Sequence, residues 1–320
     1  MRKQPWAVIA WTQVSRRSES LAREFGACYF RLSRVDRPRA LILVYLARNF
    51  LWTIAWLLWR RPRVVITFHA HPLISLCGLM YTSLFRKSLI PDVHTAGFLD
   101  YDFFPARQLS LFVWKRARLV LVHNEAAREY LNEQYPDLGE KLFVLEDPLP
   151  RIDVKDPLPK GTRTSCTYIC RFSGDEPYRE FLQAAEGLPD MDVYVTGNIS
   201  KVPGLQTEFR SSHIHFTGFL PDQEYFRRLA ASDFLVALTT RPYTLMSAGY
   251  EALSLEKPLL VSDSEALRSY LGPLASYCSN TVESIRAGLQ TLQTGVPRQK
   301  KAWAQLKQEK IRNWASKKQK

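Results

Sequence analysis

The chain has 320 residues, a length typical of about two domains. Its hydrophobic content of 46% excludes a disordered or fibrous protein, and five cysteines without a CxxC pair indicate neither a disulfide framework nor a structural zinc site. The net charge of +13 is concentrated at the two ends: residues 1–63 carry a net +10 and residues 297–320 a net +8, which leaves −5 between them. Such a surface attracts an anionic lipid, a nucleic acid or a phosphorylated substrate.

The apolar segments near the amino terminus predict a cytoplasmic protein. The run Trp6–Trp11 is too short for the core of a signal peptide, and an odd number of cysteines fits a reducing compartment. The longer run Ala40–Trp59 has Arg48 and Asn49 at its middle, where charge is costly in lipid, so it predicts a helix docked on a sheet rather than a membrane span. Its stripe of Trp52, Trp56 and Trp59 leaves open whether part of this helix enters a membrane interface.

The first half of the chain alternates short apolar runs with segments of helical length, which is the pattern of a parallel α/β domain. The expected strands are Trp6–Thr12, Ala27–Leu32, Arg63–Ala70, Ser88–His94, Arg118–Asn124 and Lys141–Leu145. Besides Ala40–Trp59, the expected helices are Ser15–Phe25, Leu73–Arg86, Gln108–Arg116 and Glu125–Gln134. We therefore expect residues 1–150 to form one Rossmann-like domain.

A proline-rich linker at residues 151–162 follows, and the alternation then restarts. Strands are expected at Thr164–Arg171, Met191–Thr196, His213–Thr217, Asp233–Leu238, Pro258–Ser262 and Ala275–Cys278. Helices are expected at Tyr178–Glu186, Asp222–Ala231, Ser247–Leu255, Glu265–Tyr270 and Thr281–Gln293, and a basic helix at Arg298–Ser316. Residues 163–296 thus predict a second Rossmann-like domain, followed by a terminal helix over residues 297–320.

Polar residues end neighbouring strands of the predicted first domain. Asp92 and His94 end one strand, while His69 and His71 end the strand before it. Parallel α/β sheets bind ligands at the carboxyl edge, so these side chains are candidates for proton transfer and acceptor binding, although a single histidine is more often structural. The nearby pair Asp100 and Asp102 matches the DxD motif of a metal site, but we expect a loop with solvated or helix-capping acids and no bound metal.

The second half offers candidates for binding a diphosphate. Arg171 ends a strand at the point where a helix should begin, and an arginine beside a helix amino terminus is suited to a pyrophosphate, although an interdomain salt bridge is the alternative. Glycines follow two other strands and let the backbone turn tightly or approach a ligand, in Gly197-Asn198 and Gly218-Phe219-Leu220. No GxGxxG follows the first strand and no Walker A loop is present, which argues against a nicotinamide enzyme and an ATPase.

The segment Leu245–Asp263 (LMSAGYEALSLEKPLLVSD) resembles the nucleotide-sugar-binding segment of glycosyltransferase family 4. The resemblance implies the GT-B fold: two Rossmann-like domains facing a central cleft, an acceptor domain and a donor domain, with the carboxyl-terminal helix returning to pack on the first. In that pattern Glu251 takes the position of the glutamate that binds the ribose. Tyr243, followed by Thr244, stands where the family has a glutamate for the transferred sugar, and Glu176 stands where a phosphate-binding lysine is expected.

The resemblance further implies a retaining, metal-independent transferase that needs no cofactor and uses a nucleotide-diphosphate sugar as its donor. Arg171 matches the family's diphosphate-binding arginine, Gly218-Phe219-Leu220 resembles the loop beside the nucleobase, and His94 falls where many members carry a catalytic residue. The acceptor is expected to be a glycan or lipid-linked sugar, at an anionic membrane surface on the cytoplasmic side. A non-catalytic GT-B partner protein remains open because of Tyr243 and Glu176, whereas no motif favours nucleic-acid binding.

Overall fold

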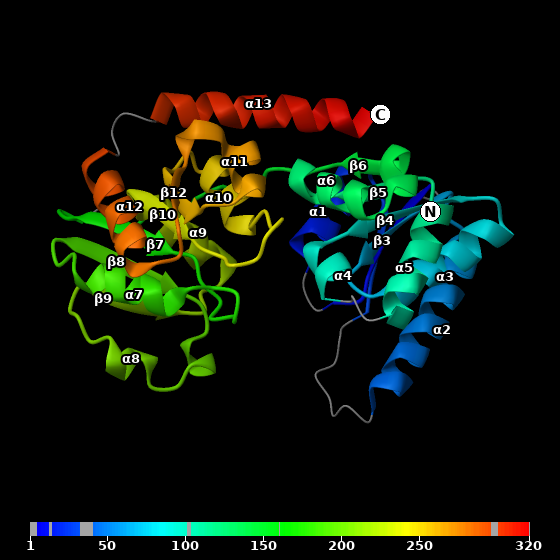
Figure 1. The fold of residues 1–320 in the computed structure, drawn as a ribbon, viewed down its shortest axis with the longest axis horizontal. Helices are drawn as coiled ribbons and strands as arrows, with labels where there is room; N and C mark the ends of the chain where they lie inside the picture. Colours follow the sequence, from blue (N-terminus) through cyan, green and yellow to red (C-terminus); the bar gives the residue numbers. More distant parts are fainter. Residues whose placement is uncertain are drawn as a thin grey trace. The chain divides into compact units, whose positions relative to one another are not determined.

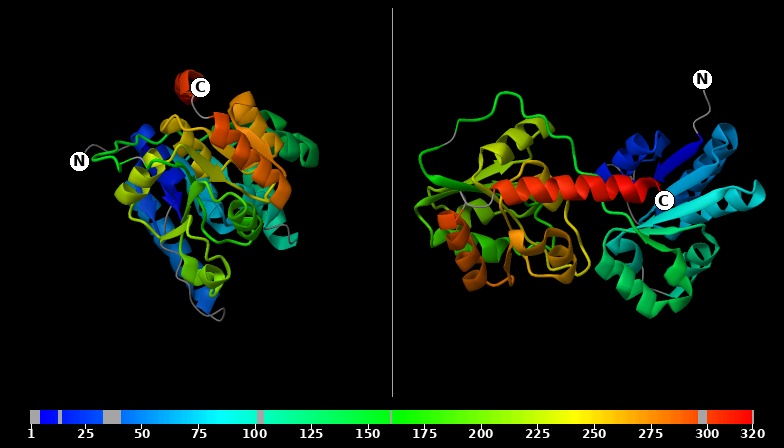
Figure 2. Two further views of the ribbon diagram at one scale, coloured as in Figure 1. Left: turned by 90° about the vertical axis from the view of Figure 1, so that its left-hand side faces the viewer. Right: turned by 90° about the horizontal axis from the view of Figure 1, so that it is seen from above.

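The computed structural model describes residues 5–12, 15–32, 41–100, 104–159, 161–295 and 300–319. The chain divides into two compact units, residues 1–148 and 149–320. Each unit contains one parallel sheet with helices on both of its faces (Figures 1 and 2). The predicted α/β class and the pair of Rossmann-like domains are therefore confirmed.

In the first unit, the sheet has the strand order β2-β1-β3-β4-β5-β6, and every pair is parallel. Its strands are β1 (Trp6–Ala10), β2 (Cys28–Arg31), β3 (Val64–His69), β4 (Ser88–Val93), β5 (Val120–Val122) and β6 (Leu142–Val144). Its helices are α1 (Arg16–Glu24), α2 (Ile42–Arg60), α3 (Pro72–Leu84), α4 (Thr95–Leu99), α5 (Phe104–Arg116) and α6 (Glu125–Gln134), with a 3-10 helix at Pro136–Lys141. The order reverses between β1 and β3, and such a reversal opens a crevice at the carboxyl edge.

The helices of the first unit begin where the sequence supplies caps. Ser15 caps α1 by accepting a hydrogen bond from the Ser18 amide, and Asn124 caps α6 in the same way through the Ala127 amide. The apolar core beside α3 and α5 includes Ile9, Val65 and Trp114. These short caps place each helix start directly at the carboxyl edge of the sheet, beside the candidate residues.

The second unit has the strand order β9-β8-β7-β10-β11-β12, which is the order of a dinucleotide-binding Rossmann fold. Its strands are β7 (Thr164–Tyr168), β8 (Met191–Thr196), β9 (Ile214–Gly218), β10 (Phe234–Ala237), β11 (Leu259–Ser262) and β12 (Ser276–Cys278). Its helices are α7 (Tyr178–Glu186), α8 (Leu205–Glu208), α9 (Asp222–Ala231), α10 (Ser247–Ser254), α11 (Glu265–Leu271), α12 (Val282–Gly295) and α13 (Lys300–Gln319), with 3-10 turns at Ile199–Lys201 and Gly272–Leu274. The reversal here lies between β7 and β10.

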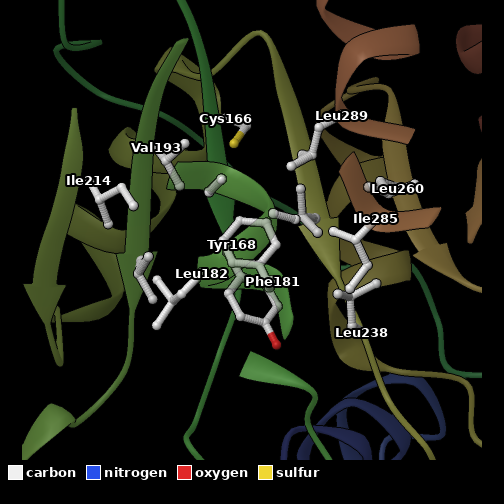
Figure 3. Packing of buried hydrophobic residues seen from close by; sticks show 14 of the residues in the cluster. Cys166, Tyr168, Phe181, Leu182, Val193, Ile214, Leu238, Leu260, Ile285 and Leu289 are labelled. Atoms are coloured by element: carbon white, nitrogen blue, oxygen red, sulfur yellow. The ribbon is translucent and has the colours of Figure 1, made fainter. Parts of the chain in front are cut away.

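Apolar side chains cover both faces of the second sheet. Along β10, Phe234 and Val236 belong to one core while Leu235 and Ala237 belong to the core on the opposite face. Figure 3 shows the first of these cores, with Tyr168 against Phe181 and residues of α12 closing over the strands. A strand buried on both faces explains why these segments read as continuous apolar runs in the sequence.

The terminal helix α13 is anchored within the second unit. Trp303 is fully buried in the core that contains α10 and α11, and Lys307 donates hydrogen bonds to the Ser254 carbonyl and the Glu256 carboxylate. This part of the helix therefore belongs to the second unit, and its return to the first domain stays a prediction.

Candidate functional site

The carboxyl edge of the first sheet holds a buried ion pair between Asp92 and Arg17. Asp92 lies on β4, and Arg17 reaches it from the first turn of α1, with Nε 2.9 Å from both carboxylate oxygens. Arg17 also donates to the Leu145 carbonyl and the Asp147 carboxylate. Burial alone would raise the pKa of Asp92, but the charges of Arg17 and His94 outweigh it and hold that pKa well below its usual range. The ion pair thus favours the ionised form of Asp92.

His94 follows β4 and lies at this ion pair. Its Nε2 is 3.2 Å from Oδ2 of Asp92, and its side chain is 20% exposed, whereas that of Asp92 is 1% exposed. The ring is held between those of Phe68 and His123, with centroid distances of 4.1 and 4.0 Å. Asp92 thus orients the imidazole, and His94 is the member of the pair that a substrate can reach. Asp92 itself is buried and held by Arg17, and the catalytic roles expected for Asp92 and His94 stay predictions.

His123 and Arg17 complete the cluster and were missed from the sequence. His123 directly follows β5, so the strand-end position that singled out His94 could have identified it, whereas nothing near Arg17 in the sequence marks its role. Asp92, His94 and His123 each place a ligand atom within 4.8 Å of the others. Both oxygens of Asp92 already accept hydrogen bonds from Arg17, whose positive charge opposes a cation at this position. The cluster therefore suits proton transfer better than metal binding.

His69 and His71, expected on the acceptor side, have separate structural roles. The His69 ring is fully buried between the hydroxyls of Ser75 and Ser110, at 2.7 and 3.1 Å, and burial lowers its pKa to about 3. His71 caps α3 by accepting a hydrogen bond from the Leu73 amide. His69, His71 and His94 do lie at or just after the ends of neighbouring strands, but the ring of His69 points into the core. The expected acceptor role of His69 is therefore corrected to a structural one.

Asp100 ends α4, and the remainder of the DxD motif, at residues 101–102, lies outside the described residues.

In the second unit, the loops after β7, β8 and β9 are locked together at the carboxyl edge. Gly197 has φ +104°, and a Cβ there would lie 2.2 Å from the Cys170 carbonyl oxygen, so the site requires glycine. Its amide donates to the Gly218 carbonyl, and Gly218 itself has φ +73°. Asn198 caps the following turn by accepting hydrogen bonds from Ser200. The glycines thus bring three loops into contact through backbone alone.

Arg171 projects from this edge with 74% of its side chain exposed. Glu176, which replaces the expected lysine, accepts hydrogen bonds from the backbone amides of Arg171 and Ser173 at 2.8 and 3.1 Å. Lys201 donates to the Arg171 carbonyl from the loop after β8. Glu176 therefore shapes the loop, while Arg171 and Lys201 supply positive charge beside it.

Arg241 lies in the loop after β10, the strand that neighbours β7 at the reversal. Burial acts to raise the pKa of Asp175, but the hydrogen bond from Ser173 and the charges of Arg171 and Arg241 hold it below its usual value. Asp175 also ties the two loops together, since its carbonyl accepts from the Thr240 amide at 2.7 Å. Arg171 and Arg241 thus flank the reversal between β7 and β10, where a Rossmann sheet binds its ligand.

Glu251 lies in α10 and is 3% exposed. The hydroxyl of Tyr225, from α9, donates to its carboxylate at 2.6 Å, an interaction that sequence reasoning missed. Tyr243 adopts a left-handed backbone conformation with φ +56°, and the Thr244 hydroxyl donates to the Pro242 carbonyl. At the other end of the site, Phe219 exposes 82% of its side chain and Leu220 is half-buried. The residues expected to bind the donor thus lie in α10 and in the loops that follow β9 and β10.

No protein-family model matches the chain, and no curated protein matches its sequence. Solved structures do match over nearly the whole length. Sucrose-phosphate synthase from Thermosynechococcus elongatus aligns with TM-score 0.72 and 14% identity over 98% of this chain and 96% of its own. HepE from Anabaena, solved with UDP and glucose, aligns with TM-score 0.68 and 12% identity over 97% and 98%.

A putative UDP-N-acetylglucosamine 2-epimerase from Listeria monocytogenes aligns with TM-score 0.64 and 12% identity over 94% and 91%. Identities this low show a shared fold rather than a shared reaction. The expected resemblance is therefore confirmed at the level of architecture: the chain has the GT-B fold. This fold is shared by glycosyltransferases and by enzymes described as catalysing another reaction, such as the epimerase.

Proposed function

We propose that the chain is a glycosyltransferase that moves a sugar from a nucleotide-diphosphate sugar to a glycan or lipid-linked acceptor. The observation that carries the proposal is that Arg171 and Arg241 lie in the loops after β7 and β10, the two strands at which the order of the second sheet reverses. A nucleotide diphosphate is the ligand whose charge matches two guanidinium groups at this edge. Loss of that diphosphate as a leaving group is the step that such charge stabilises.

The rest of the donor fits around the same edge. Glu251 offers a carboxylate to paired ribose hydroxyls once Tyr225 shares or yields its hydrogen bond, and exposed Phe219 offers a ring against the base. Tyr243 and Thr244 lie in the loop before α10 and are proposed to face the transferred sugar. Gly197, Gly218 and Asn198 shape the floor of this donor site.

On the acceptor side, His94 is proposed to accept the proton of the attacking hydroxyl. The carboxylate of Asp92 stabilises the imidazolium that forms, and Arg17 keeps Asp92 ionised. The bond between the sugar and the diphosphate breaks, and a new glycosidic bond forms to the acceptor oxygen. We propose that the acceptor hydroxyl attacks from the same face that the diphosphate leaves, so that the anomeric configuration is retained as the resemblance to family 4 implies. We also propose that no metal or cofactor is required, because the arginines supply the positive charge and His94 supplies the base.

Thermal-shift measurements with UDP, GDP, ADP and TDP, and with their sugars, test the donor site. We expect one nucleotide to stabilise the protein, and Arg171→Ala to weaken its binding by about tenfold or more, since a charge-assisted contact to phosphate is lost. Glu251→Ala should weaken nucleoside recognition. Arg179→Ala is the matched control, because Arg179 pairs with Glu208 on the surface. Equal ligand response in wild type and both site variants would overturn the assignment.

A non-catalytic GT-B protein is the second candidate, and Glu176 favours it. Its carboxylate accepts hydrogen bonds from the Arg171 and Ser173 amides, which are then not available to a phosphate. Sugar transfer or donor hydrolysis in the presence of EDTA distinguishes the two: turnover under these conditions supports a metal-independent enzyme. Ligand binding without any turnover, across all four donor bases, supports the non-catalytic protein.

We also propose that the protein works in the cytoplasm at an anionic membrane. All five cysteines are free and buried, which fits a reducing compartment.

A further inference from the structure

Helix α2 of the first unit is apolar on its outward side as well as on the side that packs into the unit. Its inward side buries Asn49 and Thr53, and the Trp11 indole donates to the Thr53 hydroxyl at 3.0 Å. Its outward side carries an apolar stripe that consists of Leu43, Val44, Leu51, Trp52, Leu58 and Trp59. These six side chains are between 44% and 78% exposed. The outer side of a helix that faces water is normally polar.

Neighbouring helices also expose apolar side chains. Helices α2, α3 and α5 lie side by side (Figure 1); α3 exposes Met80 and Leu84, the residue after it is the exposed Phe85, and α5 exposes Phe112. Single exposed apolar residues are ordinary, but several on helices that pack side by side indicate an interaction surface.

A row of positive charge borders the carboxyl ends of these helices. This basic edge consists of Arg61, Arg63, Arg86, Lys87, Arg116 and Arg118, all exposed. The residues share one edge of the sheet, because the Ser88 amide donates to the Arg63 carbonyl and the Arg118 amide to the Leu89 carbonyl. Residues 37–91 contain 8 Arg or Lys and no Asp or Glu.

Two of these arginines occupy positions where the backbone favours glycine. Arg61 and Arg86 end α2 and α3 in the left-handed conformation, with φ +51° and +50°. Glycine is the usual residue at such a helix end because a side chain there is strained. The chain thus retains positive charge at a cost in stability, at two successive helix ends of one edge.

We propose that the apolar stripe and the basic edge form a docking surface for an anionic phospholipid bilayer. Apolar side chains with tryptophans enter the interface between headgroups and acyl chains, while arginines and lysines bind the negative headgroups. Among the described residues, α2 is the one helix long and apolar enough to span a membrane, but its Asn49, Thr53 and Leu57 side is packed into the unit. The helix therefore lies along the membrane surface instead of crossing it.

Co-sedimentation of the full chain with vesicles tests the proposal. We expect binding to phosphatidylcholine vesicles in which about a third of the lipid is phosphatidylglycerol, release at high salt, and little binding to phosphatidylcholine alone. The double variant Arg61→Gly with Arg86→Gly should bind about tenfold or more weakly, at about 1 kcal/mol for each charge. The same double variant should unfold at a higher temperature, because its backbone strain is relieved.

Charge-matched and apolar variants complete the test. Lys155→Gly with Arg210→Gly removes two exposed positive charges from loops of the second unit and should leave vesicle binding unchanged. Leu51→Ser with Trp52→Ser should abolish binding without lowering the unfolding temperature. Wild-type binding by the Arg61 and Arg86 double variant overturns the proposal. A second result would also overturn it: the wild-type chain does not bind vesicles but dimerises, and Leu51→Ser with Trp52→Ser abolishes the dimer. The apolar stripe would then bind a second copy of the chain.

Discussion

At the scale of single residues, environment divides chemically identical side chains into different roles. His69, His94 and His123 all end strands of one sheet. His69 is buried between two hydroxyls, and burial together with the nearby charges of His94 and Arg17 lowers the pKa of His123. His94 keeps contact with solvent and with Asp92. Of these observations, only those on His94 combine partial exposure with a carboxylate partner.

The depressed pKa of His69 makes stability depend on pH. The unfolded chain protonates this histidine below about pH 6.5, whereas the folded chain does so only near pH 3, so stability falls as pH decreases between these values. From pH 7.5 to pH 5 the loss due to His69 should be about 2 kcal/mol. Urea unfolding at both pH values measures it. His69→Gln should reduce the loss by this amount, and an unchanged pH dependence would contradict the assignment.

Gly197 makes a second prediction at this scale. Gly197→Ala should destabilise the protein by about 3 kcal/mol, because it combines a left-handed backbone with a Cβ that overlaps the Cys170 carbonyl oxygen. Gly174→Ala, in the neighbouring loop, is the control, since a Cβ there meets nothing within 4 Å. Unfolding curves for the two variants should differ clearly. Similar curves would mean that the three loops are not locked as described.

At the scale of elements, α13 shows how a polar helix is held by very few side chains. Its sequence is basic and has little apolar content, yet Trp303 is fully buried, Leu306 packs beside it, and Lys307 bonds the end of α10. The apolar anchor and the lysine lie within the first half of the helix. The amino-terminal half of α13 is therefore the part that these side chains attach to the second unit.

Trp303→Ala tests that anchor. Removing a buried tryptophan should cost about 4 kcal/mol and release α13 to proteolysis at its basic sites. Trp314→Ala is the control, because Trp314 is only partly buried and contacts Lys318 of its own helix. Limited trypsin digestion, followed by mass spectrometry, should release the helix from the first variant only. Equal protection in both would place the anchor elsewhere.

At the scale of the whole molecule, the cores of the two units share no residue. The core around Ile9 and Trp114 belongs to residues 1–148, while the two cores that flank β10 belong to residues 149–320. A chain built from separate cores need not unfold in one step.

Calorimetry should therefore show two unfolding transitions. Asp92→Asn should lower one of them, because it leaves the buried Arg17 without its bidentate partner, at a cost of about 3 kcal/mol. Gly197→Ala should lower the other, and a bound nucleotide should raise that same transition. If each variant displaced both transitions equally, the units would unfold as one cooperative body.

The sequence by itself determined the class of fold, because buried strands and amphipathic helices leave periodic apolar patterns and glycines mark strand ends. It also predicted that His94, Arg171 and Gly197 lie at the carboxyl edges of the sheets, since each follows a strand. Only the tertiary structure decided which of these side chains turn outward. In the folded chain, the ring of His69 points into the core, and Arg17 pairs with Asp92 across 75 positions of sequence. The Glu176 carboxylate accepts hydrogen bonds from loop amides. Pairings between distant segments, and the direction in which a side chain leaves its strand, depend on packing that local sequence does not encode.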